Sequence, residues 1–212
     1  MIIGICGLIG SGKDTIADYL VNTHQFRRES FASSLKDAVA SVFGWDREML
    51  EGRSAQSREW REQVDAWWAN RLGMPQLTPR WVLQNWGTDV CRSYFHQDIW
   101  IASLENKLRN TKDNVVVSDC RFPNEIAAIR KAGGQIFWVR RGTLPDWFAA
   151  AEDANTGGWP NRGEKVMANL GIHHSEWAWI GTEFDQIIDN DGSLVDLYEQ
   201  LNNLVLDHHV ST

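Results

Sequence analysis

Short runs of consecutive apolar residues alternate along this chain with longer segments in which apolar residues recur every three or four positions. The short runs are typical of strands buried on both faces, and the periodic segments are typical of amphipathic helices. Strands are predicted at 1–6, 28–32, 114–118, 135–139 and 185–189. Strands that alternate with helices indicate a parallel α/β sheet with helices on both faces.

Helix boundaries are marked by glycines and capping residues. One apolar stripe ends at Gly44, and a longer one over 60–72, which contains several tryptophans and is expected to pack as core, ends at Gly73. Thr78 followed by Pro79 is typical of a helix start, and this helix is predicted to continue to residue 90. Further helices are predicted over 13–22, 100–108, 123–131 and 193–204, and the sequence after residue 141 is irregular to about residue 180.

Composition and charge then narrow the class of protein. The 212 residues fit one domain, or one domain with a small inserted subdomain, and 43% hydrophobic with 23% charged residues excludes a disordered chain. The net charge of −7 argues against a nucleic-acid partner. No apolar run is long enough to span a membrane, and the N-terminus does not look like a signal peptide. Three isolated cysteines favour a reducing, cytoplasmic location and no zinc site.

The strongest chemical signal is the segment Gly7-Leu-Ile-Gly-Ser-Gly-Lys13, which lies between a predicted strand and a predicted helix. Glycines allow positive φ angles and let backbone N–H groups approach phosphate oxygens, and the start of the helix adds a favourable dipole. Lys13 is then expected to bridge the β- and γ-phosphates. The pattern predicts that Gly10, Ser11, Gly12 and Lys13 bind the phosphates of ATP.

The residue after Lys13 departs from the usual phosphate loop. Asp14 stands where the pattern has Ser or Thr to bind Mg²⁺, and Thr15 comes one position later. Either Asp14 meets the metal, directly or through water, or Thr15 contacts a phosphate. Both residues are therefore candidates for the ATP site, and Asp14 is a candidate metal ligand.

A second constellation follows the strand at 114–118. Ligands of open α/β sheets bind at the carboxyl ends of strands, so Asp119 is predicted to lie near the phosphate loop and to hold Mg²⁺ or its water shell. Arg121 would point into the same crevice, where its planar fork suits a phosphate, and Glu125 could orient it through an ion pair. The alternative is a helix-capping aspartate followed by a surface Arg–Glu pair.

These segments together resemble a known family. The combination G-x-x-x-S-G-K-D-T, V-V-V-S-D-x-R-F-P-N-E, His174-Ser-Glu and Asn190-Asp-Gly-Ser is similar to that of the deoxynucleoside monophosphate kinases of tailed bacteriophages and their bacterial relatives. Those enzymes belong to the P-loop nucleoside monophosphate kinases. The similarity runs from residue 2 to about residue 205, and G-K-D-T with D-x-R-F-P-N-E is its most specific part.

The resemblance implies a fold and an activity. The fold would be a three-layer α/β P-loop kinase with a five-stranded parallel sheet, a helical acceptor-binding insertion at about 33–110 and a lid at about 141–180. The activity would be ATP- and Mg²⁺-dependent phosphorylation of a deoxynucleoside monophosphate to the diphosphate. A phage-encoded chain would act in the host cytoplasm.

The acceptor needs cations and a stacking surface outside the phosphate loop. Lys36 lies one turn into a predicted helix, and Thr88 and Arg92 share a helix face in a segment that resembles the family's acceptor-binding helix. Most tryptophans are expected in the core, but Trp86 and Trp100 could stack on the acceptor base. The alternative for Lys36 and Arg92 is a solvated position on a helix surface.

The predicted lid also carries cations. Arg140 ends a strand just before it, and Arg162 with Lys165 lies inside it, where closure over the phosphates would exclude water. Solvated loop charges are the alternative. The resemblance further implies that Asp191 and Gly192 lie beside the adenine of ATP, although a simple turn explains them equally well.

Other functions remain open at this stage. A kinase of the same architecture could act on a non-nucleotide phosphate such as phosphomevalonate, although the aromatic-rich acceptor region favours a base. An ATP-binding switch or assembly protein without a small acceptor would also use the phosphate loop. The tryptophan-rich surface could serve as the interface of a homodimer as readily as a base pocket.

Overall fold

A parallel sheet organises the part of the chain that carries both the phosphate loop and Asp119. The computed structural model describes residues 1–157 and 162–210, with side chains to residue 206. This described chain divides into unit 1, Met1–Ser30 with Lys107–Thr212, and unit 2, Phe31–Asn106. The predicted insertion at 33–110 covers nearly the same residues as unit 2. Each unit is described by itself.

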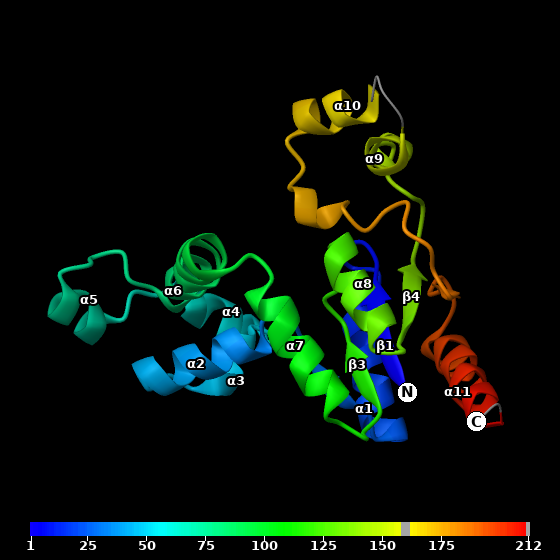
Figure 1. The fold of residues 1–212 in the computed structure, drawn as a ribbon, viewed down its shortest axis with the longest axis horizontal. Helices are drawn as coiled ribbons and strands as arrows, with labels where there is room; N and C mark the ends of the chain where they lie inside the picture. The colour runs from blue at the N-terminus through cyan, green and yellow to red at the C-terminus, as the bar shows by residue number, and fades with distance from the viewer. Residues whose placement is uncertain (158–161, 211–212) are drawn as a thin grey trace. The chain divides into compact units, whose positions relative to one another are not determined.

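The described part of unit 1 contains five parallel strands in the order β2-β3-β1-β4-β5 (Figure 1). This confirms the predicted five-stranded parallel α/β fold of the P-loop type. The second strand is shorter than the predicted 28–32. The strands are β1 (Ile2–Cys6), β2 (Arg27–Glu29), β3 (Val115–Val117), β4 (Gln135–Arg140) and β5 (Gln186–Asp189).

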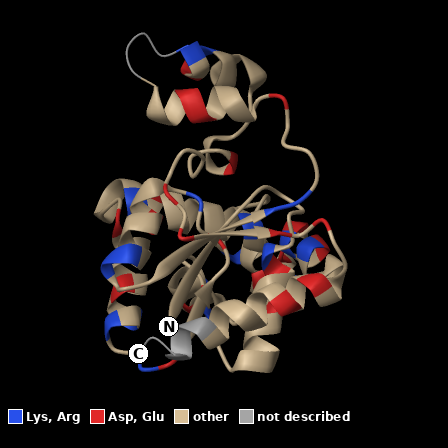
Figure 2. Cartoon of the chain, turned by 90° about the vertical axis from the view of Figure 1, so that its right-hand side faces the viewer, with Lys and Arg blue, Asp and Glu red and all other residues tan. Residues whose placement is uncertain are grey.

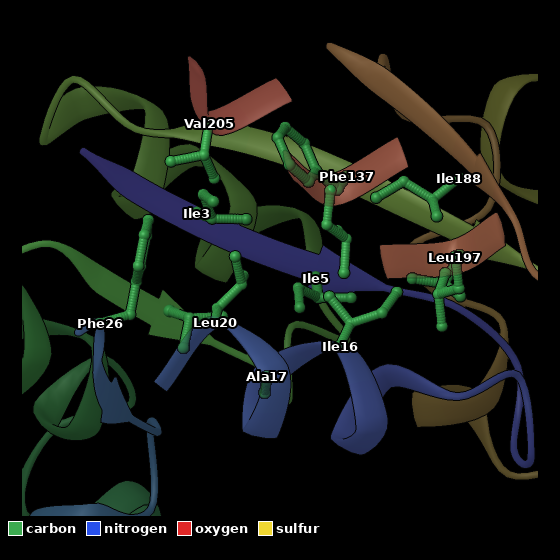
Figure 3. Close-up of a cluster of buried hydrophobic side chains, with 13 residues drawn as sticks. Ile3, Ile5, Ile16, Ala17, Leu20, Phe26, Phe137, Ile188, Leu197 and Val205 are labelled. Carbon is green, nitrogen blue, oxygen red and sulfur yellow. The ribbon is translucent and has the colours of Figure 1, made fainter. Parts of the chain in front are cut away.

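Aliphatic side chains on alternating positions of the strands form the core of unit 1 (Figure 3). Ile3 and Ile5 of β1 are fully buried against Ile16 and Leu20 of α1 (Lys13–His24) and near Leu197 of α11 (Leu194–Val210). The intervening glycine of β1 faces the other side of the sheet, toward α8 (Pro123–Lys131). The sheet is therefore covered on both faces, which is why its strands read as continuous apolar runs.

Unit 2 is built from short helices around an aromatic-rich core. Leu35, Val39, Leu50 and Leu77 are buried at its centre, and half-buried tryptophans pack around them, as most of the tryptophans were expected to do. Its elements are α2 (Ser33–Phe43), α3 (Arg47–Glu51), α4 (Ala55–Glu62), α5 (Ala66–Leu72), α6 (Pro79–Gln84), the π-helix η1 (Asn85–Phe95) and the start of α7 (Ile99–Arg109).

The single helix predicted over 60–72 is wrong. The chain breaks after α4, and Asp65 starts α5 by accepting a hydrogen bond from the Trp68 backbone N–H at 3.1 Å. The break turns part of the stripe outward, so that Trp67 is 63% exposed while Trp68 packs against the core. Asp65 is a residue type that favours a helix start, so its position inside the apolar stripe could have predicted the break.

The predicted helix over 79–90 begins as expected at Thr78, which accepts a hydrogen bond from the Trp81 N–H, but it changes type at residue 85. From there it is a π-helix, with i→i+5 bonding such as His96 N–H to the Cys91 carbonyl at 2.9 Å. The Trp100 indole N–H donates to the Gly87 carbonyl at 2.9 Å, and an inserted donor of this kind disrupts the α-helical ladder.

The region predicted as irregular after residue 141 contains regular helices. The helices α9 (Phe148–Thr156) and α10 (Arg162–Leu170) pack side by side, followed by a 3₁₀ turn η2 (His174–Glu176) (Figure 1). Gly163 makes the close approach possible, because a Cβ there would lie 2.2 Å from the Ala150 carbonyl oxygen. The alanine-rich start of α9 was the missed signal. No helix in the described residues is long and apolar enough to cross a membrane.

Candidate active site

The phosphate loop connects β1 to α1 as the sequence pattern predicts. Gly10 and Gly12 adopt φ angles of 78° and 101°, in the left-handed region where a side chain is strained. The Ser11 hydroxyl between them is buried and has no hydrogen-bond partner among the described residues. A buried polar atom without a partner is unfavourable, and a polar ligand at the loop would satisfy it.

Lys13 lies across this loop. Its Nζ donates to the carbonyl oxygens of Gly7 and Leu8, each at 2.8 Å. Burial lowers the pKa of Lys13 and the charge of Arg121 lowers it further, against smaller opposing effects of Asp14 and Glu176. Within the described residues the ammonium group bonds only to these neutral oxygens, although charges of both signs act on it.

Asn190 supports the loop from the end of β5. Its side-chain NH₂ donates to the Ser11 carbonyl at 2.8 Å, and a Cβ on Gly12 would lie 2.3 Å from its Nδ2. Sequence reasoning used this asparagine only as part of a family motif. A polar residue directly after a predicted buried strand was the signal that could have revealed it.

Arg28 is a second residue that sequence reasoning missed. Its guanidinium pairs with Asp14, with Asp18 at 2.8 Å, and donates to Ser118 Oγ at 2.7 Å. It thereby links the start of α1 to the residue before Asp119. The signal was an arginine inside a predicted strand, where a charge needs partners.

Asp119 and Arg121 follow β3, as predicted, at the carboxyl edge of the sheet. Arg121 donates through Nη1 to Glu176 Oε1 at 3.3 Å and to Ser175 Oγ at 3.5 Å, so it connects this segment to η2. Glu125 is only 4% exposed, and its carboxylate accepts from the backbone N–H of Arg121 at 2.8 Å. It thus fixes the backbone of Arg121 at the start of α8.

The loops after β4 and β5 are tied to each other. Arg140 forms a bidentate pair with Asp189 at 2.7 and 3.0 Å, and this pair lowers the pKa of Asp189. The Asp191 carboxylate accepts from the Gly142 backbone N–H at 2.5 Å. Gly192 lies close to a neighbouring side chain, because a Cβ there would be 2.7 Å from Asp196 Oδ2. Arg140 and Asp191, both predicted ligand contacts, therefore also shape this edge of unit 1.

A cavity of about 460 Å³ opens beside the phosphate loop. Leu8–Ser11 form one wall, and the end of β4 from Trp138 to Arg141 forms another. Trp147, Ile172 and Glu176 complete it from the segment that contains α9 and η2. An apolar cavity with cations at its rim suits a phosphorylated ligand that carries a flat apolar group.

The two predicted metal ligands, Asp14 and Asp119, differ in how exposed their carboxylates are. Asp14 is largely exposed and is held by Arg28, whereas Asp119 is half-buried. The described residues contain no cluster of three or more His, Cys, Asp or Glu side chains that could hold a metal alone. Mg²⁺ usually takes only one or two carboxylates, with phosphates and waters as further ligands, so these residues fit such an ion.

The predicted acceptor residues lie in unit 2. Lys36 Nζ pairs with Glu51 Oε2 at 2.6 Å, and Arg47 pairs with the same carboxylate at 2.5 Å. Burial would raise the pKa of Glu51, but the hydrogen bond and charge of Lys36, and then those of Arg47, bring it down to about 2. Thr88 and Arg92 lie on η1, with Thr88 exposed, and Trp100 is held by its bond to Gly87.

Comparison with known proteins gives the context for this geometry. The sequence profile of the family described as "Deoxynucleotide monophosphate kinase" matches residues 55–169. A putative deoxynucleotide monophosphate kinase of Acanthamoeba polyphaga mimivirus is 33% identical over 155 residues, covering 66% of this chain and 74% of that one. The deoxynucleoside-5′-monophosphate kinase of Escherichia phage T5 is 26% identical over 180 residues, covering 62% and 72%. Shikimate kinase from Aquifex aeolicus aligns over 100% of both chains, with 11% identity and a TM-score of 0.48.

Proposed function

The chain belongs to the deoxynucleotide monophosphate kinase family, and we propose that the phosphate loop of unit 1 is where it binds its phosphoryl donor. It is an ATP-dependent kinase that transfers the terminal phosphoryl group of ATP to a deoxynucleoside monophosphate, giving the diphosphate and ADP. The observation that carries the assignment is Lys13, a buried cation that bonds only to loop carbonyls next to an unpartnered Ser11 hydroxyl in the described chain.

Phosphoryl transfer depends on positioning and on neutralising charge rather than on covalent chemistry by the protein. Lys13 exchanges its carbonyl partners for phosphate oxygens. The negative charge of the phosphate then offsets the cost of burying the ammonium group. Arg121, whose charge already acts on Lys13, meets the transferred group from the end of β3. Glu125 holds its backbone, and Ser175 with Glu176 orients its guanidinium.

The metal assignment follows from the same edge of the sheet. We assign Asp119 as a ligand of Mg²⁺. Asp14, which is paired with Arg28, contacts the ion through a water molecule. Mg²⁺ would neutralise charge on the β- and γ-phosphates. Thr15, in the first turn of α1, contacts a phosphate. Asp191 and Gly192 lie beside the adenine, where the bond of Asp191 to Gly142 fixes the loop.

The acceptor and lid assignments complete the proposal. Lys36, Thr88, Arg92 and Trp100 of unit 2 contact the acceptor nucleotide. The lid spans about 141–180, of which residues 158–161 lie outside the described part, and Arg140 with the exposed Arg162 and Lys165 provides its cations. The enzyme acts on free nucleotides in the cytoplasm, in the host if it is phage-encoded. Exposed apolar residues of unit 2 such as Trp67 are available for a homodimer.

The test is a coupled assay of ADP release with ATP and Mg²⁺, adding dTMP, dGMP, dCMP, dAMP, GMP or phosphomevalonate separately. ADP release should depend on a deoxynucleotide and should be lost in Lys13→Ala and Arg121→Ala. Arg130→Ala is the matched control. Arg130 lies on α8 but pairs with Asp185 at 3.4 Å and shares no partner with Lys13 or Arg121. ADP release at the same rate with and without every acceptor would show an ATPase or switch instead.

A further inference from the structure

Arg61, in the last turn of α4, lies where a side chain at position 52 would be if that residue were not glycine. Gly52 ends α3 with a φ angle of 70°, and α3 and α4 pack together. A Cβ at Gly52 would lie 2.1 Å from the Cζ of Arg61 and 2.1 Å from its Nη2. The guanidinium therefore lies directly over the Gly52 backbone, and any larger residue there would displace it.

The guanidinium of Arg61 has no charge partner in the described chain. Its Nε is buried without a hydrogen bond, and the side chain makes no ion pair with any described residue. Acidic and basic residues are interspersed along the helices (Figure 2). Several other cations of unit 2 have a partner. Lys36 and Arg47 share Glu51, Arg80 pairs with Glu62, and Arg58 donates to the Arg53 carbonyl at 2.9 Å.

Burial is the main influence on the charge of Arg61, and cations and carboxylates both lie around it. Burial lowers the pKa of Arg61, and the charges of Arg80 and Arg58 also lower it, whereas those of Glu62 and Glu51 raise it. Desolvating a charged group without a hydrogen-bonded partner is costly, and such a position is retained most readily where a ligand supplies the partner. An anion is the ligand that this site would take.

We propose that Arg61 binds the phosphate of the acceptor deoxynucleoside monophosphate over Gly52. The planar guanidinium matches two phosphate oxygens at once, which an ammonium group does not. The donor phosphates belong to the phosphate loop of unit 1, and the acceptor phosphate is the remaining anion of the reaction. This inference rests on the proposed function, because it takes the deoxynucleotide as the ligand.

The first test is steady-state kinetics of Arg61→Gln with the preferred deoxynucleotide. Losing charge-assisted hydrogen bonds should raise KM for the deoxynucleotide about tenfold to hundredfold, with KM for ATP unchanged. Arg61→Lys should recover only part of this loss. Arg58→Gln is the matched control on the same helix and should keep the wild-type KM, because Arg58 is bonded to a carbonyl.

A second readout separates phosphate recognition from a structural role. The deoxynucleoside without its phosphate should inhibit wild type and Arg61→Gln with the same Ki, whereas inhibition by inorganic phosphate should weaken in the variant. Gly52→Ala, which keeps the arginine but displaces it, should raise KM for the deoxynucleotide as well. The melting temperature of Arg61→Gln should not fall, because no hydrogen bond to a described residue is lost.

The outcomes distinguish this inference from the kinase assignment. A wild-type KM for the deoxynucleotide in Arg61→Gln would overturn the role of Arg61 and leave the kinase assignment intact. A raised KM for ATP instead would also overturn it, because the bound phosphate would then be that of the donor. Absence of deoxynucleotide-dependent ADP release in the wild type would remove the proposed function itself.

Discussion

Lys13 of unit 1 and Lys36 of unit 2, both predicted to meet phosphates, are held in different ways. In unit 1 the site residues follow strands of an aliphatic sheet, and Lys13 bonds to backbone carbonyls and to no carboxylate in the described part of the chain. In unit 2 short helices surround an aromatic core, and Lys36 is locked to Glu51 at 2.6 Å with both side chains nearly buried. Backbone carbonyls thus hold Lys13 ready for a ligand in unit 1, whereas a carboxylate fixes Lys36 in unit 2.

This difference bears on the predicted role of Lys36. Lys13 can give up neutral carbonyls for phosphate oxygens at little loss, because the phosphate is the better partner for a charge. Lys36 would have to leave a carboxylate that it shares with Arg47. Within unit 2, Arg61 is the cation whose position more closely resembles that of Lys13, since both are desolvated and neither touches a described carboxylate.

The largest effect is expected where backbone geometry matters most, at Gly12→Ala. The added Cβ would be strained at a φ of 101° and would lie 2.3 Å from Asn190 Nδ2. Left-handed strain and overpacking together should lower the free energy of unfolding by roughly 2 to 4 kcal/mol. Displacing Ser11 and Lys13 should lower kcat/KM more than about hundredfold. Urea unfolding and the ADP-release assay measure the two effects.

Gly44→Ala in unit 2 is the control for this comparison. Gly44 ends α2 with a φ of 68°, but no described atom lies within 4 Å of its Cβ position. It should lose only about 1 to 2 kcal/mol from left-handed strain and keep its activity. Equal losses in the two variants would show that close approach in the phosphate loop is unimportant.

The next largest effect tests the ion pairs of unit 2 through Glu51→Gln. A folded pKa of about 2 against an ordinary 4.5 means that the carboxylate should stabilise the fold by roughly 2 to 3 kcal/mol at neutral pH. Because the folded pKa is depressed, this stabilisation is present above about pH 4.5 and is lost as the pH falls toward 2. The difference in unfolding free energy between wild type and Glu51→Gln should therefore shrink between pH 5 and pH 2. A difference that stayed constant over this range would contradict the depressed pKa.

The same contrast explains what the sequence could predict. The strands of unit 1 are continuous apolar runs because both faces of the sheet are covered, and the phosphate loop lies between a strand and a helix, so both were evident. Unit 2 has no such regular pattern. The break at Asp65 depends on a local helix cap, and the π-helix around Gly87 on a hydrogen bond from Trp100 of another helix. Hydrophobic periodicity reveals neither contact.

The candidate site was predictable where function imposes a motif. Lys13, Asp119 and Arg121 follow from local spacing, and the resemblance adds η2, which Arg121 contacts. Local spacing does not reveal Arg28 and Asn190, because their partners are distant in sequence. It does not reveal Arg61 either, because what marks that residue is a buried Nε without a hydrogen bond. Arg28 joins Asp14 to Ser118 only in the folded chain, where the three residues meet from separate elements.

A smaller effect is expected from Arg28→Gln, which tests whether side chains as well as backbone position the unit 1 site. Its side chain is 14% exposed, and its loss leaves Asp14 and Asp18 without their shared counter-charge. Stability should fall by about 1 to 2 kcal/mol and kcat about tenfold, with KM for the deoxynucleotide little changed. Arg27→Gln, on the neighbouring and more exposed residue, is the control and should keep wild-type kcat. A wild-type kcat in Arg28→Gln would limit the positioning of the site to the backbone.

The smallest effect, and the sharpest contrast with Glu51, is the stability of Lys13→Met. Burial lowers the pKa of Lys13, so the protonated lysine destabilises the fold at neutral pH. The destabilisation is relieved as the pH rises through the lowered folded pKa toward 10.5. Lys13→Met should therefore be more stable than wild type by less than about 1 kcal/mol at pH 7, although inactive, and this gain should fade at alkaline pH. Chemical denaturation at pH 7 and pH 10 measures it. A variant less stable than wild type at pH 7 would show that the carbonyl bonds of Lys13 outweigh its desolvation, and that unit 1, like unit 2, gains stability from its buried cation.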